Sequence, residues 1–293
     1  MNLIYKAISI LFIIILTASA ISAGGGWPQP KGKAYIKLSE WWVISDQHFT
    51  DIGRIDPNVT LAIYNTSLYA EYGITNRLTG IVYAPLFSRA TVNNVVSGTT
   101  QEVLIEGDAI NGLGDADISL KYGLTGGGGP LVLAVTATLG LPLGQASGGR
   151  DNNLQTGDGE MNQMLRLDGS TSFQLGTGIN SYVSAYGAYN NRVNGFSDEL
   201  RYGLEAGLGL MSGKLWLVGR ADVVDSRKNG DPANQTLPTS IFANNSEFTS
   251  LAIDVAYKVT DKWGISAGVA NAVSGGIILA SPSYNVGVFI DLK

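Results

Sequence analysis

Alternating apolar and polar residues run into and out of the stretch Tyr257-Lys258-Val259-Thr260-Asp261-Lys262-Trp263, which has a polar pair at its centre. This pattern is typical of a tight β-hairpin. The same frame recurs at Tyr72 to Leu78 and at Tyr122 to Thr125, where Gly126 to Gly129 replace the polar pair. In each copy a tyrosine on the apolar face stands just before the turn, where a membrane barrel places its interfacial aromatic residues. The three copies therefore predict a transmembrane β-barrel with these three tyrosines at one rim.

The composition favours the same class of fold. Of the 293 residues, 45% are hydrophobic and 15% are charged, with 38 glycines, no cysteine and a mean hydropathy of +0.13. A soluble globular domain carries about 25% charged residues. No long apolar run occurs in the body of the chain, which excludes a bundle of membrane helices and favours many strands with one apolar face. The net charge of -5 argues against nucleic-acid binding, and the lack of cysteine excludes disulfides, thiolate metal sites and a lipoprotein anchor.

The first residues have the pattern of a secretory signal peptide. Lys6 precedes an uncharged run from Ala7 to Ala23, and small residues offer cleavage after Ala20 or Ala23. A retained membrane anchor is the alternative, but the apolar core is shorter than the ~20 residues that a span needs. We therefore predict a signal peptide at 1–23, a flexible start of the mature chain at 24–31 and a barrel at 32–293 in the outer membrane of a Gram-negative bacterium.

From residue 32 onward the chain divides into about twelve segments of alternating polarity, each about ten residues long. These segments are 34–44, 59–72, 78–87, 115–124, 131–141, 165–175, 182–190, 200–210, 215–223, 251–259, 263–269 and 284–292. Five short turns alternate with six longer polar loops, so both ends of the barrel fall on the short-turn side. In bacterial barrels that side is periplasmic. The predicted fold class is all-β, an antiparallel up-and-down transmembrane barrel of about 12 strands.

Several motifs resemble a known family. They are Lys31-Gly32-Lys33-Ala34-Tyr35, Gly112-Leu113-Gly114-Asp115-Ala116-Asp117-Ile118-Ser119-Leu120-Lys121-Tyr122, Leu139-Gly140-Leu141-Pro142-Leu143-Gly144 and Gly176-Thr177-Gly178. Over most of the mature chain the sequence resembles the outer-membrane barrels grouped as meta-pathway phenol-degradation-like proteins and predicted transporters. The resemblance implies the passage of small, often aromatic or apolar compounds. The chain departs from many such barrels at its last residues, Phe289 to Lys293, which lack a terminal aromatic residue.

Charged residues of both signs occupy the strand face opposite the apolar one. An arginine facing lipid at mid-bilayer costs about 2 to 4 kcal/mol, so we expect these side chains in the lumen. Two interpretations stay open: a lattice of cross-strand pairs that stiffens a narrow barrel, which we favour, and a constriction that binds the transported molecule. The candidate residues of this pathway are Arg166, Asp168, Arg201, Glu205, Arg220, Asp222, Asp254, Asp117 and Lys121.

Other polar motifs fit catalytic or metal sites poorly. His48 is the only histidine, and no serine stands in a matching motif, which argues against a Ser-His hydrolase. The run Asp151 to Glu160 resembles an acidic calcium loop but has no glycine at its sixth position. Gly126 to Gly129 fit no phosphate-binding pattern. We therefore expect no catalytic residue, no metal and no cofactor.

Together these patterns predict a channel or transporter for small molecules rather than an enzyme. Its expected partners are outer-membrane lipid, the barrel-assembly machinery and a small-molecule cargo. Two alternatives stay open. One is an outer-membrane lipid-modifying enzyme, and the other is a structural or adhesive surface barrel with its specificity in the loops 90–111 and 225–245.

Overall fold

The computed structural model describes residues 25–126, 129–176, 178–234 and 241–292, so the predicted signal peptide lies outside the described residues. Twelve strands form the wall of a closed barrel. They are β1 (Ala34–Phe49), β2 (Ile55–Gly73), β3 (Leu78–Val92), β7 (Ala116–Gly123), β8 (Val132–Leu141), β9 (Asn162–Leu175), β10 (Ile179–Arg192), β11 (Glu199–Leu210), β12 (Leu215–Ser226), β13 (Glu247–Lys258), β14 (Trp263–Gly276) and β16 (Ser283–Leu292).

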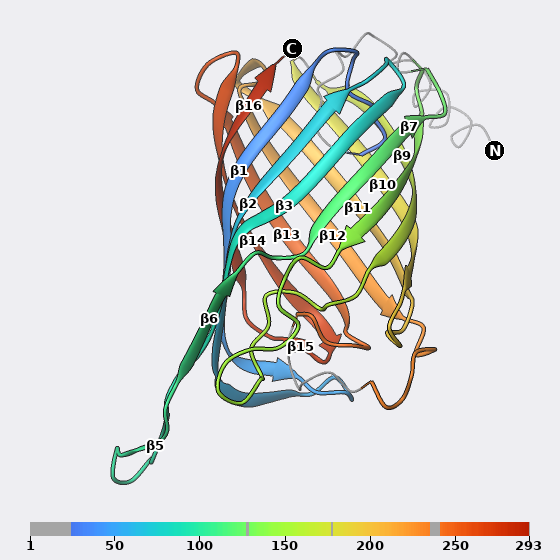
Figure 1. The fold of residues 1–293 in the computed structure, drawn as a ribbon. Coiled ribbons are helices and arrows are strands. Elements are labelled where there is room, and N and C mark those ends of the chain that lie inside the picture. The colour runs from blue at the N-terminus through green and yellow to red at the C-terminus, as the bar shows by residue number, and fades with distance from the viewer. Residues whose placement is uncertain (1–24, 127–128, 177, 235–240, 293) are drawn as a thin grey trace, which may run out of the picture.

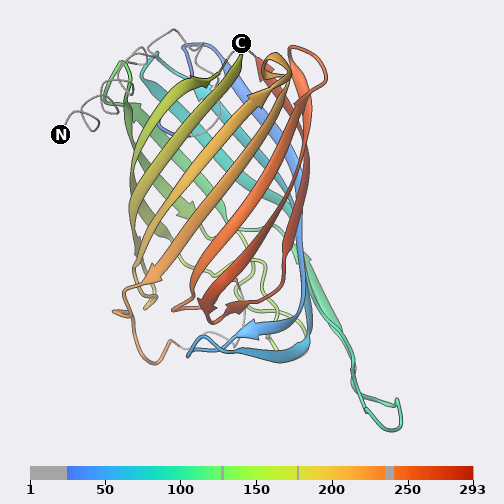
Figure 2. The same ribbon diagram turned by 180° about the vertical axis from the view of Figure 1, so that it is seen from behind.

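The barrel closes because β1 pairs with both the second and the last strand. Ala34 lies opposite Tyr72 of β2 on one side and opposite Leu292 of β16 on the other. Every pairing in the wall is antiparallel, and the strands follow one another around the barrel in chain order (Figures 1 and 2). A closed sheet satisfies the backbone groups of every strand without water, which is what a bilayer demands. The predicted up-and-down barrel of 12 strands is confirmed.

The two ends of the barrel differ in their connections. At one end, called the turn end, short segments join β2 to β3, β7 to β8, β9 to β10, β11 to β12 and β13 to β14, and one of them contains the 3-10 turn η1 (Met211–Gly213). The opposite end, called the loop end, carries the other connections, among them the longest ones, from β3 to β7, from β8 to β9 and from β12 to β13 (Figure 1). Tyr72, Tyr122 and Tyr257 all stand at the turn end with exposed side chains, in the common phase that their sequence frames predict. Within the described residues, no helix is long and apolar enough to span a membrane.

Most strands extend further toward the loop end than the sequence predicts. The fourth predicted strand, 115–124, corresponds to β7, and a separate strand, β6 (Asp108–Gly112), precedes it where the sequence predicts the loop 90–111. The cause is Pro85 in the middle of β3, which has no N–H for the ladder. Gly114 fits against this proline, because a Cβ on Gly114 would lie 2.7 Å from the Pro85 Cβ. On one side of this point β3 pairs with β7, and on the other side it pairs with β6.

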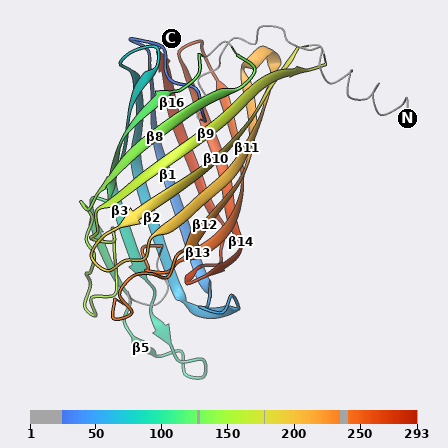
Figure 3. The same ribbon diagram turned by 90° about the vertical axis from the view of Figure 1, so that its right-hand side faces the viewer.

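A two-stranded arm leaves the barrel at the loop end, where the sequence predicts only a long loop. β3 and β6 lead into β4 (Val95–Val96) and β5 (Val103–Ile105), which pair with each other and with no other strand of the described residues. Figures 1 and 3 show the arm reaching well beyond the other loops. A further short strand, β15 (Ile278–Leu279), pairs with the end of β1 inside the loop-end region.

The barrel has an apolar exterior and a polar interior. On β7, Ile118, Leu120 and Tyr122 are exposed on the outside, while Ser119 and Lys121 are buried inside. The same alternation exposes large apolar side chains around the whole wall. Lipid would cover this outer surface, so the lumen is the part of the molecule that can serve a small molecule.

Candidate functional site: the lumen of the barrel

Residues 25–31, called the terminal segment, lie inside the barrel at the turn end. The Gly26 N–H donates to Ser170 Oγ of β9 (2.8 Å), and the Gln29 N–H donates to Thr79 Oγ1 of β3 (2.8 Å). The Gln29 side-chain amide donates to Glu71 Oε2 of β2 (2.9 Å). The sequence predicts a flexible start for these residues, whereas the structure gives them defined partners on three strands.

Two glycines of the repeated hairpin frames make room for the terminal segment. A Cβ on Gly73 would lie 2.0 Å from the Pro30 carbonyl oxygen, and a Cβ on Gly123 would lie 2.7 Å from Pro28 Cγ. Each of these glycines follows a rim tyrosine, so its own side would point inward. Because neither position carries a side chain, the backbone of the segment can approach the wall closely. Trp27 packs edge-on against Tyr182, with ring centroids 5.8 Å apart.

Six of the predicted lumen residues form two networks on the wall from β9 to β13. In the first, Arg220 Nε donates to Glu205 Oε2 (2.6 Å), and Arg220 also pairs with Asp254. Glu205 accepts a hydrogen bond from the Tyr182 hydroxyl (2.7 Å). Arg220 is therefore held between carboxylates of both neighbouring strands, β11 and β13.

In the second network, Arg166 Nη2 donates to Asp168 Oδ1 (2.7 Å), and Arg166 Nε donates to both carboxylate oxygens. The Arg166 guanidinium lies over the ring of Tyr186, 3.7 Å from its centroid. The Tyr186 hydroxyl donates to Asp222 Oδ1 (2.7 Å). The cation–π contact thus connects the Arg166–Asp168 pair to Asp222 through Tyr186, a residue that was not among the predicted candidates.

The remaining predicted residues are placed differently. Arg201 Nε donates to Glu199 Oε2 (2.8 Å) at the loop end of β11. Lys121 Nζ lies 3.9 Å from Glu71 Oε1, and both side chains are buried. Among the described residues, Asp117 forms no ion pair. The structure thus joins eight of the nine candidates to a partner, within one strand for Arg166–Asp168 and Arg201–Glu199 and between strands for the others, while Asp117 stands apart.

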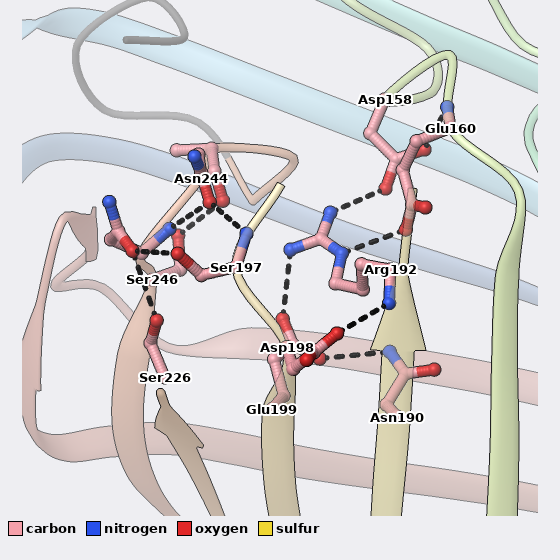
Figure 4. Close-up of polar contacts among 12 residues, drawn as sticks. Asp158, Glu160, Asn190, Arg192, Ser197, Asp198, Glu199, Ser226, Asn244 and Ser246 are labelled. Carbon is pink, nitrogen blue, oxygen red and sulfur yellow. Dashed lines mark hydrogen bonds and ion pairs between the residues drawn. The ribbon is translucent and has the colours of Figure 1, made fainter. Parts of the chain in front are cut away.

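Arg192 is the centre of a cluster at the loop end that the sequence analysis missed. Its guanidinium donates to Asp158 Oδ2 (2.9 Å), Glu160 Oε1 (2.7 Å) and Glu199 Oε1 (3.0 Å), as Figure 4 shows. Asp158 and Glu160 belong to the acidic run 151–160, so Arg192 fastens this loop to the wall of the barrel. Burial raises the pKa of Glu160, and the hydrogen bonds from Arg192 and from the Val193 N–H oppose that rise.

Asp198 closes the neighbouring connection between β10 and β11. It accepts hydrogen bonds from the Tyr189 hydroxyl (2.6 Å), from Asn229 Nδ2 (2.8 Å), from the Arg192 N–H (2.9 Å) and from Asn191 Nδ2 (3.0 Å). Desolvation favours the neutral form of this carboxyl. The four donors outweigh it and hold the pKa of Asp198 at about 2.

Two cavities follow one another inside the barrel. The inner cavity, of about 480 Å³, is lined by residues from opposite sides of the wall, among them Tyr69 of β2, Tyr182 of β10 and Arg220 of β12. The outer cavity, of about 370 Å³, lies toward the loop end and is lined by Arg192, Arg201 and a group of apolar side chains. Trp41 of β1 lines both cavities. A molecule that moves between them would pass this ring.

The features weighed as catalytic or metal sites do not assemble into one. His48 lies opposite Asp56 and Leu279 in the strand register, and its side-chain Nδ1 atom has no hydrogen-bond partner in the part of the chain that the structure describes. The described residues contain no group of three histidine, cysteine or acidic side chains placed to hold a metal ion. The acidic run instead directs Asp158 and Glu160 to Arg192.

No family model and no curated protein matches the chain. A solved outer membrane channel from Pseudomonas putida F1 matches with a TM-score of 0.60 at 14% identity, over 93% of this chain and all of that chain. The fold is that of an outer-membrane β-barrel. The beta domain of the Bordetella autotransporter BrkA matches with a TM-score of 0.50 at 13% identity, over 89% of this chain and 100% of that one. At these identities the likeness shows the fold alone.

Alternation places further charged residues in the lumen that the sequence analysis did not select as candidates. Lys37 alternates with Tyr35, Ser39 and Trp41 on the predicted inner face of β1, and it lines the inner cavity. Lys258 lies beside Asp291, with Nζ 3.1 Å from Oδ2. The period-two pattern was sufficient to orient these side chains. Which of them are paired depends on strands distant in sequence, and no local signal reports that.

Proposed function

We propose that the protein is a channel of the bacterial outer membrane that passes small molecules, aromatic or apolar ones among them, through its lumen. The observation that carries the proposal is the pair of cavities that share Trp41. Side chains fill the interior of a barrel of about eight strands, whereas about sixteen strands leave an aqueous channel. A barrel of twelve strands lies between these two cases, and its two cavities fit a narrow, selective path for small molecules.

The lining of the cavities supports a cargo with an apolar part. The outer cavity exposes aliphatic and aromatic side chains beside its two arginines, namely Val43, Val224, Ile241, Ala243, Phe248, Ile278 and Leu279. The inner cavity is rich in aromatic rings. Ligand pockets of about 300 to 1,000 Å³ with such walls and a few polar groups suit small organic molecules.

The proposal includes the setting of the channel and its partners. An N-terminal signal peptide would export the chain, the barrel-assembly machinery would insert it, and outer-membrane lipid would surround the apolar exterior. The turn end would face the periplasm, so the terminal segment would close the path on that side. We propose transport rather than catalysis because eight of the nine candidate charged residues are held by partners in the wall of the barrel.

Single-channel recording of the refolded protein in planar bilayers tests this function. We expect a small current in the wild type. The double variant Trp27→Ala/Gln29→Ala removes two contacts of the terminal segment and should give a larger and steadier current. Trp42→Ala is the matched control, since Trp42 stacks on Tyr284 outside the lumen, and its current should equal that of the wild type. Absence of current from the wild type and from the double variant would refute the channel.

One observation favours surface adhesion as a second candidate function. The arm of β4 and β5 carries exposed Val103, Leu104 and Ile105 far from the lumen (Figure 1). Unpaired strand edges with apolar side chains can add a strand from another chain. Replacing residues 95–105 by a short Gly-Ser turn should abolish attachment of expressing cells to a surface if the arm is adhesive, and should leave the current unchanged.

A further inference from the structure

We propose that the inner cavity is a binding site for a small amphipathic carboxylate, with Lys37 as the residue that holds the carboxylate group. The inference rests on the proposed function and deepens it, because it names the class of molecule that the path would select. Two observations support it. Of the two lysines that line this cavity, Lys37 has no ion-pair partner among the described residues, and aromatic rings line the cavity beside it.

The cavity has the size and walls of an aromatic ligand site. Its aromatic lining comes from six strands and consists of Tyr35, Trp41, Tyr69, Tyr83, Tyr182, Trp216 and Phe289. Tyr35 stacks on Phe289, with ring centroids 5.7 Å apart, and Tyr182 lies 5.8 Å from Trp216. Such faces bind planar or apolar groups, and ring pairs of this kind contribute beyond the buried area alone.

Seven charged side chains line this cavity, and six of them form ion pairs. Arg220 is shared by Glu205 and Asp254, and Lys258 pairs with Asp291. Glu71 accepts hydrogen bonds from Gln29 and Tyr69 and lies near Lys121. Each of these carboxylates thus already has a donor, and Arg220 is the single cation shared by Glu205 and Asp254.

Lys37 is the exception. Within the described part of the chain, no carboxylate lies within 4.0 Å of its ammonium group and it makes no hydrogen bond. Asp254 and Arg220, which are engaged with each other, are the charges that act on it. An ammonium carries three donors, and in a largely desolvated lumen a charge-assisted hydrogen bond to a carboxylate is worth more than in water. A ligand carboxylate would supply the missing acceptor.

The position of Lys37 aligns this ammonium with the aromatic walls. Its side chain lies against Gly287 of β16, where an added Cβ would be 2.8 Å from Lys37 Cε. Gly287 thus leaves the space that the lysine chain occupies. Tyr35 and Trp41 flank Lys37 on the same face of β1. A ligand with its acid group at Lys37 would therefore have an aromatic ring on either side along β1, Tyr35 in one direction and Trp41 in the other.

Calorimetric binding to the refolded full-length barrel in detergent is the decisive experiment, with three probes of one skeleton: 3-phenylpropionate, 3-phenylpropanamide and 3-phenylpropylamine. We expect saturable binding of the acid to the wild type, with the amide and the amine weaker. Lys37→Met should lower the affinity for 3-phenylpropionate by at least about tenfold, as expected for loss of a charge-assisted hydrogen bond. Lys37→Arg should restore most of the affinity.

Lys258→Met is the matched control, because Lys258 lines the same cavity but is paired with Asp291. It should change the affinity for the acid by less than about threefold. Equal binding of the acid to the wild type and to Lys37→Met, or tighter binding of the amine than of the acid, would overturn the assignment. Parallel bilayer recordings separate the two proposals. Acid binding without current would refute only the channel, and current without acid binding would refute only this site.

Discussion

Two regions of the lumen wall differ in whether their charged side chains are paired. The strands β9 to β13, called the paired wall, carry most of the charged lumen residues, and their guanidinium groups are bound by carboxylates of the same or the next strand. The strands β14, β16 and β1, called the open wall, carry small and aromatic side chains, and Lys37 there has no ion-pair partner among the described residues. The comparison teaches that charge density alone does not mark a binding site. Where a charged group lacks a partner, it is available to a ligand.

Glycines on the open wall make room for side chains of the neighbouring strands. A Cβ on Gly268 of β14 would lie 2.1 Å from Asp254 Oδ1, and a Cβ on Gly264 would lie 2.3 Å from the Phe289 ring. Side chains from both neighbouring strands therefore lie across β14. The same device at Gly287 accommodates Lys37. The paired wall has the same arrangement at Gly207 of β11, where an added Cβ would lie 2.0 Å from the Tyr182 ring, so the two walls differ in the pairing of their charges rather than in their glycines.

The largest difference between the walls should appear in stability. Arg192 is buried against Asp158, Glu160 and Glu199, so Arg192→Met would leave Asp158 and Glu160 without their cation, while Glu199 would keep only Arg201. We expect the free energy of unfolding to fall by about 3 to 5 kcal/mol. Lys37→Met on the open wall breaks no ion pair and should cost less than about 1 kcal/mol. Urea unfolding of the barrel in lipid vesicles measures both. Equal losses in the two variants would erase the distinction between the walls.

The paired wall should also set the ion selectivity of the lumen. Replacing Arg166, Arg201 and Arg220 together with alanine leaves their carboxylate partners in place. We therefore expect higher conductance and a reversal potential shifted toward cation selectivity, because the local field becomes more negative. A control triple variant, Arg54→Ala/Arg77→Ala/Arg150→Ala, makes the same charge change at exposed positions outside the lumen. If both triple variants behave alike, the lumen arginines serve only the structure of the wall.

The sequence was sufficient for the architecture because alternation and hairpin frames are local. The frame at Tyr122 and its copies placed the turn end correctly, and alternation on β7 predicted which of Ile118 and Ser119 would face outward. The rest depends on contacts between residues far apart in the chain. Gln29 meets Glu71 across 42 positions, and Arg220 meets Asp254 across 34. The β4–β5 arm was missed because its two apolar runs, Val95-Val96 and Val103 to Ile105, are only two and three residues long, and among the described residues they pair with each other alone.

The smallest expected effect is a loss of stability at low pH through Asp198, at the loop end of the paired wall. An aspartate has a pKa of about 3.9 in the unfolded chain, and four donors hold the pKa of Asp198 at about 2 in the folded one. A lowered folded-state pKa means that the ionised form stabilises the barrel above about pH 4, and that this contribution is lost as the pH falls toward 2. After allowance for solvent screening at the rim, we expect about 1 kcal/mol. Asp198→Asn should lack this loss, so the difference in unfolding free energy between wild type and variant should shrink from pH 5 to pH 2. A constant difference across that range would show that Asp198 acts through shape rather than charge.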